Sequence, residues 1–204
     1  MPQKQITIIN TGCANISSVR FAFERLGVNV LVTDNTEKIA AAERLVLPGV
    51  GSAPAAMNSI KAKGLLSCIQ ALEQPVLGVC LGMQIMVERS QENDLGNVAA
   101  TECLNLIPGE VKRMHAQGLR IPHMGWNEVS SLSDNALFAG IPNGTHFYFV
   151  HSFAVNPYAH TLATCSYGDE FSAAIHKDNF YGVQFHPERS SDAGAQLLTN
   201  FLNL

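Results

Sequence analysis

The chain has 204 residues and a net charge of −4 at pH 7, and its 13 Lys and Arg residues are scattered along the sequence. The chain therefore has no cluster of basic residues of the kind that nucleic-acid binding requires. No apolar run approaches the ~18 residues of a membrane span, and the polar N-terminus does not resemble a signal peptide, so we expect a cytoplasmic protein with one domain over residues 1–204.

The composition is poor in side chains that water solvates well. Charged residues make up 15% of the chain, against a typical ~25%, while apolar residues make up 47%. A large apolar interface with a partner subunit would explain this imbalance, although a well-buried parallel sheet would explain part of it. We favour the partner interface.

The cysteines and histidines do not form an obvious metal site. The five cysteines are an odd number without a Cys-x-x-Cys pair, which argues against a disulfide framework and against a zinc ribbon. His146 and His151 are five residues apart on an expected strand, so they face opposite sides. We expect no metal and no cofactor.

The first ninety residues alternate apolar strands with amphipathic helices, which is typical of a parallel sheet covered by helices. The expected elements are strands at 6–9, 28–32, 45–47 and 75–79 and a helix at 17–26. Gly27 follows that helix, as a terminal glycine should. Ligands of such folds gather at the carboxyl ends of the strands, where the loops 10–12 and 48–51 lie.

The glycine-rich loop 48–52 lacks the lysine of a phosphate loop and the Gly-x-Gly-x-x-Gly spacing. Acyl transfer, in contrast, develops negative charge on an oxygen and needs fixed backbone donors. We therefore predict an oxyanion hole between the loop near Gly51 and the N–H of Leu81.

Cys80 ends the strand at 75–79, and Leu81, Ile85 and Met86 then recur at helical spacing with Glu88 and Arg89 on the other side. The sequence predicts a tight strand-to-helix elbow with Cys80 at its tip. Glycines stand two residues before and two residues after it, at 78 and 82, and their missing Cβ atoms let neighbouring backbone approach, as a nucleophile elbow requires.

From about Val98 onward strands dominate, with turns at 108–109 and 142–144 and a closing helix at 193–202. The predicted fold class is therefore α/β. It has a mostly parallel central sheet flanked by helices, with additional antiparallel strands in the C-terminal half.

His186 and Glu188 are expected to activate the cysteine. Lowering the pKa of a thiol from ~8.5 to about 7 needs roughly 2 kcal/mol, and a helix N-terminus supplies only ~0.3–1 kcal/mol. Residues i and i+2 of an extended segment share a face, and Pro187 biases His186 away from helix. The carboxylate can then accept one imidazole N–H while the other ring nitrogen faces the sulfur.

The stretch Gly78–Gln84 and the later His186–Glu188 closely resemble the cysteine elbow and the base segment of the class I, triad-type glutamine amidotransferases. Within that family, further segments look like the glutaminase subunits of imidazole glycerol phosphate synthase. These segments are 48–51, 122–127, 148–152 and 180–188.

The resemblance implies a glutaminase with the catalytic triad Cys80, His186 and Glu188, which forms a γ-glutamyl thioester from L-glutamine and releases L-glutamate and ammonia. The ammonia would pass to a (βα)₈-barrel cyclase subunit, the heterodimer partner, in histidine biosynthesis. Substrate-binding positions carried over are Gly49, Gln84, Glu92, Val150, His151 and Ser152. Interface positions are Asn15, Trp126 and Tyr148, while Arg189 replaces a lysine found in many members.

The alternative within this chemistry is the glutaminase subunit of another amidotransferase, of anthranilate or pyridoxal phosphate synthesis. A cysteine hydrolase or peptidase would cut γ-glutamyl peptides or proteins without a partner, and Gln84 counts against it. A subunit that only binds and regulates its partner is opposed by the intact triad.

Overall fold

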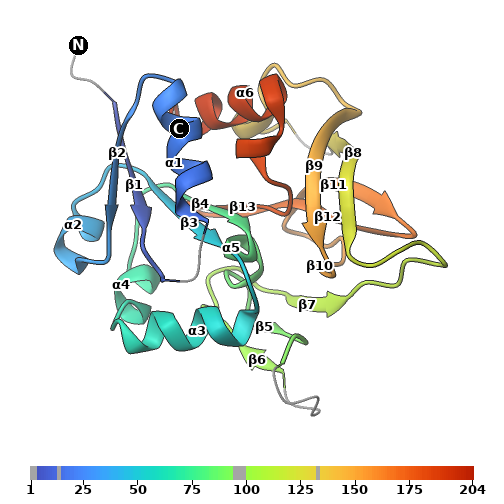
Figure 1. Ribbon diagram of the computed structural model, residues 1–204, viewed down its shortest axis with the longest axis horizontal. Coiled ribbons are helices and arrows are strands. Elements are labelled where there is room, and N and C mark those ends of the chain that lie inside the picture. Colours follow the sequence, from blue (N-terminus) through green and yellow to red (C-terminus); the bar gives the residue numbers. More distant parts are fainter. Residues whose placement is uncertain (1–3, 13–14, 94–99, 132–133) are drawn as a thin grey trace.

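The structure is a computed structural model that describes residues 4–12, 15–93, 100–131 and 134–204. Cys13 and Val98 lie outside the described residues. Figure 1 shows a central sheet that runs through the molecule, with helices on both faces of its N-terminal half and a strand-rich C-terminal half beside it.

One half of the nine-stranded central sheet is parallel. Its strands, in spatial order, are β2 (Asn29–Thr33), β1 (Gln5–Ile9), β3 (Leu45–Gly49), β4 (Val76–Cys80) and β13 (Phe180–Val183). The sheet continues antiparallel through β12 (Asp169–Lys177), β11 (Thr161–Tyr167), β8 (His123–Ser131) and β9 (Thr145–His151). The predicted fold class is confirmed.

A smaller sheet lies below the antiparallel half (Figure 1). Its strand order is β10 (Phe153–Val155), β7 (Glu110–Arg113), β5 (Arg89–Ser90) and β6 (Thr101–Glu102). Because β9 ends at His151 and β10 begins at Phe153, the chain passes from one sheet to the other at Ser152.

The helices divide between the two faces of the parallel strands (Figure 1). Helices α1 (Ile16–Arg25) and α6 (Ser191–Phe201) share one apolar cluster with the sheet, whereas α2 (Thr36–Ala40), α3 (Ala53–Ala62), α4 (Leu66–Gln70) and α5 (Leu81–Gln84) share another. Two single turns of 3₁₀ helix, η1 (Ala136–Phe138) and η2 (Pro187–Arg189), complete the elements. None of the helices formed by the described residues is long and apolar enough to cross a membrane.

Strand β4 shows how the sequence supplies both clusters. Leu77 and Val79 belong to the cluster that contains Phe23 of α1, while Val76 belongs to the cluster that contains Ile60 of α3. Successive side chains of a strand point to opposite faces, so a continuous apolar run is what a strand buried on both faces needs.

Helix α1 ends just before Gly27, the glycine that the sequence predicts to terminate it. Gly27 has φ +74, its N–H donates to the Glu24 carbonyl, and the N–H of Val28 donates to the Phe23 carbonyl. This pair of bonds is the Schellman arrangement, which needs a left-handed residue after the helix. The expected role of Gly27 is confirmed.

The expected helix after Cys80 is much shorter than its apolar spacing indicates. Helix α5 ends at Gln84, and Arg89 lies in strand β5 instead of on a helix face. The reason is competition for the backbone: the Ile85 carbonyl accepts from Leu104 N–H and the Glu88 carbonyl accepts from Cys103 N–H. Those bonds replace the next helical turn.

Candidate active site

The register of the parallel strands brings three loops to one point. Gly49 at the end of β3 pairs with Cys80 at the end of β4, and Val183 at the end of β13 pairs with Val79. The residues that follow β3 and β13 therefore flank the cysteine on both sides. This is the carboxyl edge of the sheet, where ligands of α/β folds bind.

Cys80 occupies a strained elbow between β4 and α5. Its backbone has φ 54 and ψ −111, a region that non-glycine residues rarely adopt. Such a conformation costs of order ~1–3 kcal/mol and is held by the surrounding packing. The predicted nucleophile elbow is present.

Glycines let the elbow sit directly on the sheet. A Cβ on Gly82 would lie 1.9 Å from the Leu47 carbonyl oxygen, and one on Gly78 would lie 2.8 Å from the backbone nitrogen of Met83. Gly182 of β13 gives room to the same methionine, since a Cβ there would lie 2.7 Å from Met83 Cγ. The missing Cβ of Gly182 therefore has the same role as those of Gly78 and Gly82, because it lets α5 lie close to the sheet.

His186 and Glu188 form a buried pair beside this elbow. His186 Nδ1 lies 2.8 Å from Glu188 Oε1, and their side chains are 9% and 3% exposed. The backbone N–H of His186 donates to the Tyr148 carbonyl, which fixes the base to strand β9. The pair meets as expected, but by a different route: His186 is extended, whereas Glu188 lies in the 3₁₀ turn η2 that Pro187 begins.

The electrostatics of His186 suit a proton acceptor for a thiol. Burial alone lowers its pKa, but the nearby Cys80 and the hydrogen-bonded Glu188 outweigh burial and raise the pKa to about 10. In the geometry of this structure, Nε2 of His186 is buried and has no hydrogen-bond partner among the described residues. Cys80 therefore lies near enough to favour the imidazolium, without a closed N–H to sulfur bond.

The triad opens into a hollow of about 400 Å³. Most of the predicted site residues line it together: Asn15, Gly51, Cys80, Leu81, Gln84, Glu92, Val150, His151, Ser152, His186 and Glu188. Residues from six separate stretches of the chain thus meet around one sulfur atom.

Three of the predicted residues lie outside this lining. Gly49 borders a much smaller adjoining hollow and packs on the elbow, where a Cβ would lie 2.7 Å from Gly82 N. Trp126 and Tyr148 lie on the paired strands β8 and β9, with ring centroids 6.2 Å apart. The Trp126 side chain is exposed, and the Tyr148 ring has the Arg189 guanidinium 6.0 Å from its centroid.

Glu92 reaches the loop expected to hold the oxyanion. Its Oε2 accepts the backbone N–H of Ala53 at 2.8 Å, in the first turn of α3. The negative carboxylate lies at the positive end of that helix, which is a favourable arrangement. Gly51, two residues before Ala53, has φ +93, a backbone conformation that favours glycine.

His151 contacts another buried histidine, His123, which the sequence did not indicate as a site residue. Its Nδ1 lies 2.9 Å from the Phe153 carbonyl oxygen, and its Nε2 lies 3.1 Å from Nδ1 of His123. Burial lowers the pKa of His123 to about 4 and that of His151 to about 3, the latter helped by the neighbouring His123 and His186. Both imidazoles are neutral at pH 7.

The other described cysteines are poor nucleophiles. Burial raises the pKa of Cys103 and of Cys165 to about 12, and it also raises the pKa of Cys68. The thiolate is the reactive form of cysteine, so these three side chains remain as thiols at neutral pH.

Gln184 is the main residue of the site that the sequence analysis missed. It is fully buried, and its Nε2 lies 3.8 Å from Cys80 Sγ. It stands two residues before His186, so the same i, i+2 argument that joined His186 to Glu188 also applies to it. Pro122 and Phe153 line the hollow as well and were not predicted to.

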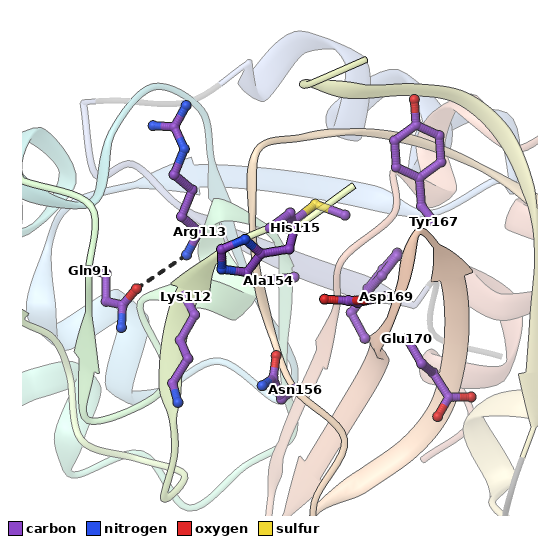
Figure 2. A pocket seen from close by; sticks show the side chains of 11 residues that line it. Gln91, Lys112, Arg113, His115, Ala154, Asn156, Tyr167, Asp169 and Glu170 are labelled. Carbon is purple, nitrogen blue, oxygen red and sulfur yellow. Dashed lines mark hydrogen bonds between the residues drawn. The ribbon is translucent and has the colours of Figure 1, made fainter. Parts of the chain in front are cut away.

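A second hollow of about 180 Å³ lies apart from the triad, between β7 and the hairpin of β11 and β12. Figure 2 shows Lys112, Arg113 and His115 on one side of it and Asp169 and Glu170 on the other. These side chains are exposed. None of the predicted site residues lines this hollow.

Comparison with known proteins agrees with the geometry. Residues 7–204 match the family described as glutamine amidotransferase class-I. The chain is 57% identical over 197 residues to the imidazole glycerol phosphate synthase subunit HisH of Shewanella sediminis, covering 97% of this chain and 89% of that protein. It is 53% identical over 199 residues to the same subunit of Pasteurella multocida, covering 98% of each chain.

Solved structures at lower identity show the fold. A glutamine amidotransferase structure superposes with a TM-score of 0.73 at 16% identity, covering 97% of each chain. PurLQS from Thermotoga maritima gives 0.70 at 17% identity, covering 98% of each. With a family match over almost its whole length and relatives above half identity, this chain belongs to the class-I glutamine amidotransferases and, among them, to the family of the imidazole glycerol phosphate synthase subunit HisH.

Proposed function

We propose that the chain is the glutaminase subunit of an imidazole glycerol phosphate synthase. As one domain over residues 1–204, it hydrolyses L-glutamine to L-glutamate and ammonia and delivers the ammonia to a (βα)₈-barrel cyclase subunit. The observation that carries this proposal is the strained Cys80 beside the buried His186–Glu188 pair, within one hollow of about 400 Å³.

The chemistry follows from that arrangement. His186 takes the proton of the Cys80 thiol, and the sulfur attacks the side-chain amide carbon of glutamine. The oxyanion that forms is stabilised by backbone N–H groups of Gly51 and Leu81. As the C–N bond breaks, His186 returns its proton to the leaving ammonia.

Hydrolysis of the thioester reverses the roles. His186 removes a proton from a water molecule that attacks the γ-glutamyl carbonyl, and the Cys80 sulfur leaves and is reprotonated. Glu188 holds the imidazole in one orientation and stabilises its charged form throughout. No metal or other cofactor takes part in these steps.

The rest of the hollow binds the amino-acid end of glutamine. Glu92 places a carboxylate where it can attract the α-ammonium group, and Val150 and His151 of β9, with Ser152 directly after that strand, offer backbone groups in the same lining. Gln84 lines the same hollow, and Gly49, at the end of β3, precedes the loop that carries Gly51. These residues make up the proposed substrate-binding set, in which Gly49 acts through the loop that it supports.

The partner covers the rim of the same hollow. Met124 and Trp126 of β8 are 63% and 53% exposed, and Val50, which lines the hollow, is also exposed. Exposed large apolar side chains beside a catalytic site indicate a contact surface. We propose that Asn15, Trp126 and Tyr148 contact the cyclase subunit there, so that ammonia leaves into the partner instead of into water.

The relatives favour this function over the alternative. Full-length matches at 57% and 53% identity are to subunits of imidazole glycerol phosphate synthase. A glutaminase of anthranilate or pyridoxal phosphate synthesis would share the triad, but the chain matches the histidine-pathway subunit over its whole length.

The test measures glutamate release from L-glutamine by the purified chain, mixed with the cognate cyclase subunit and that subunit's ligand. The rate of glutamate release should reach its full value only when the partner is present, and Cys80→Ala should abolish it. Cys68→Ala is the matched control, because it removes a thiol outside the hollow, and it should leave the rate unchanged. Glutamate release that survives in Cys80→Ala would overturn the proposal.

A further inference from the structure

The Cys80 sulfur has two polar neighbours besides the histidine. Gln184 Nε2 lies 3.8 Å from Sγ, and the Val150 carbonyl oxygen lies 3.9 Å from it. Both distances are within reach of a hydrogen bond to sulfur. A carbonyl can only accept, so Val150 suits the thiol, whereas an amide N–H donor suits the thiolate.

The orientation of the Gln184 amide is fixed by a second buried glutamine. Gln84 Nε2 lies 2.8 Å from the Phe153 carbonyl oxygen and 3.0 Å from Gln184 Oε1. The Phe153 carbonyl only accepts, so it is the nitrogen of Gln84 that must face it. The same nitrogen then meets the oxygen of Gln184, which leaves the Gln184 nitrogen facing the sulfur.

The reverse orientation is unfavourable. Turning the Gln184 amide by half a turn would place two NH₂ groups against each other and an oxygen against the sulfur. A buried polar group that loses its partner costs about 1–3 kcal/mol. Gln184 has no access to water that could relieve that cost, since its side chain is fully buried.

The histidine pair strengthens the anchor at Phe153. His151 Nδ1 also contacts the Phe153 carbonyl and therefore carries a proton, which leaves Nε2 of the neutral ring as an acceptor. That acceptor faces Nδ1 of His123, and Nε2 of His123 lies 3.4 Å from Asn127 Nδ2. The donor and the acceptor are thus determined for each contact in the series that runs from Asn127 to the Cys80 sulfur.

We propose that Gln184 is a catalytic residue of this glutaminase: its amide N–H donates to the Cys80 sulfur and stabilises the thiolate, with Gln84 holding the amide in that orientation. The proposal rests on the proposed function, because it assigns a further role in the same nucleophilic step. It also supplies a side-chain donor to the sulfur at an elbow where α5 contributes only a single helical turn.

The experiment measures the reactivity of the sulfur directly, without glutamine. Iodoacetamide is reacted with the intact chain across neutral and mildly alkaline pH, and mass spectrometry follows each cysteine separately. In Gln184→Met and Gln184→Glu, which remove the donor at similar volume, Cys80 should be alkylated about tenfold more slowly at neutral pH, a difference of about 1.4 kcal/mol. The pH midpoint of its alkylation should move upward.

Two controls separate this effect from a change in folding. Cys68 is an internal reference, and its alkylation should be the same in every variant. Gln70→Glu makes the same amide-to-carboxylate change where the amide donates to the Leu104 carbonyl outside the hollow, and Cys80 should react there as in the unaltered chain. An unchanged Cys80 rate and midpoint in Gln184→Met would overturn the proposal.

Glutamate release by the complex with the cyclase subunit, measured on the same samples, keeps the two proposals distinct. If the unaltered chain releases glutamate while its Gln184 variants keep a normal Cys80 alkylation rate, the glutaminase function stands and the role of Gln184 fails. If the alkylation contrast is found and the unaltered chain releases no glutamate, the donor role stands and the glutaminase function fails.

Discussion

Glu188 holds the His186 imidazole through a 2.8 Å contact in a place that water scarcely reaches. Replacing it by glutamine keeps the size but removes the negative charge. We expect Glu188→Gln to lower kcat for glutamine by on the order of 10²–10⁴-fold with a smaller effect on KM, because the imidazolium loses its partner. Steady-state glutamate release in the complex with the cyclase subunit measures this.

The same variant has a predicted pH signature. Glu188 helps to raise the pKa of His186 to about 10, so its loss brings that pKa down and the imidazolium is lost at lower pH. The alkaline limb of the rate profile should therefore move toward neutral pH. Glu24→Gln, which alters an exposed carboxylate paired with Arg20, is the control. An unchanged limb in Glu188→Gln would contradict the assigned role of this carboxylate.

The proposed catalytic residues could be recognised in the sequence because they lie within short motifs. Cys80 has its glycines two residues away, and His186 and Glu188 flank one proline. Gln184 and His123 were not predicted as site residues, because the contact that gives each its place in the site is with a residue far along the chain. The first contacts Cys80 104 residues away, and the second contacts His151 28 residues away.

At the level of elements, the elbow depends on how closely α5 lies on β3. Gly82→Ala would place a Cβ 1.9 Å from the Leu47 carbonyl oxygen, which is backbone and cannot move aside as a side chain would. Overpacking of this kind costs about 1–3 kcal/mol or more. We expect a loss of at least about 2 kcal/mol in the free energy of unfolding, measured in urea, together with a slower alkylation of Cys80.

Gly64→Ala separates backbone strain from the steric clash. Gly64 has φ +67, but a Cβ there meets nothing within 4 Å. The substitution should cost only about 1 kcal/mol from strain and should leave Cys80 alkylation as it is. If Gly82→Ala were no worse than Gly64→Ala, the close approach of α5 to β3 would not be needed.

Element lengths were predicted less well than element types. The apolar residues Leu81, Ile85 and Met86 fit a helix, yet only one turn forms because the segment 103–107 takes over the carbonyls of 85–88. That competition is invisible to a periodicity argument, which compares neighbours along the chain only. The closing helix α6, in contrast, lies at 191–201, close to the expected 193–202, because no such competitor faces it.

At the level of the whole molecule, one exposed face carries the expected partner contact. Trp126→Ala should weaken binding of the cyclase subunit by at least about 2 kcal/mol, or roughly thirtyfold in Kd, because buried tryptophans are common interface hot spots. Titration of the labelled subunit measures Kd. Phe21→Ala is the matched control: Phe21 is as exposed as Trp126, at 53%, but lies on α1. Equal losses in both variants would contradict the interface.

The buried histidines predict the acid sensitivity of the fold. Histidines in the unfolded chain have a pKa near ~6.5, while in the folded chain burial lowers the pKa of His123 to about 4 and of His151 to about 3. The unfolded state therefore binds more protons below pH ~6.5, so stability is complete above that pH and is lost as the pH falls. Between pH 6.5 and 5 the loss is about 2 kcal/mol per histidine.

Urea unfolding at neutral and at acidic pH tests this. His123→Phe, which replaces a ring stacked between Phe149 and Tyr167, should flatten the decline by about half. His146→Gln changes an exposed histidine of β9 and should leave the slope as it is. A stability that does not fall between these pH values would show that the fold does not lower the pKa of either histidine.

Much of the whole fold could be predicted from the alternation of strands and helices, including the antiparallel strands of the C-terminal half. The strand order could not. β13 lies beside β4, 104 residues earlier in the chain, because the two pair in parallel from Phe180 and Val76. Nothing in the local pattern of either strand specifies that neighbour, and their glycines at 182 and 78 give only a hint once the pairing is known.

The place of β13 has a consequence for synthesis of the protein on the ribosome. Cys80 at the end of β4 is synthesised about a hundred residues before β13, the strand that joins the two halves of the sheet, and before the imidazole of His186 that follows it. Until they arrive, β4 is an open edge, and the nascent chain has a thiol with no proton acceptor. The sulfur and the imidazole can therefore meet only after β13 has entered the sheet beside β4.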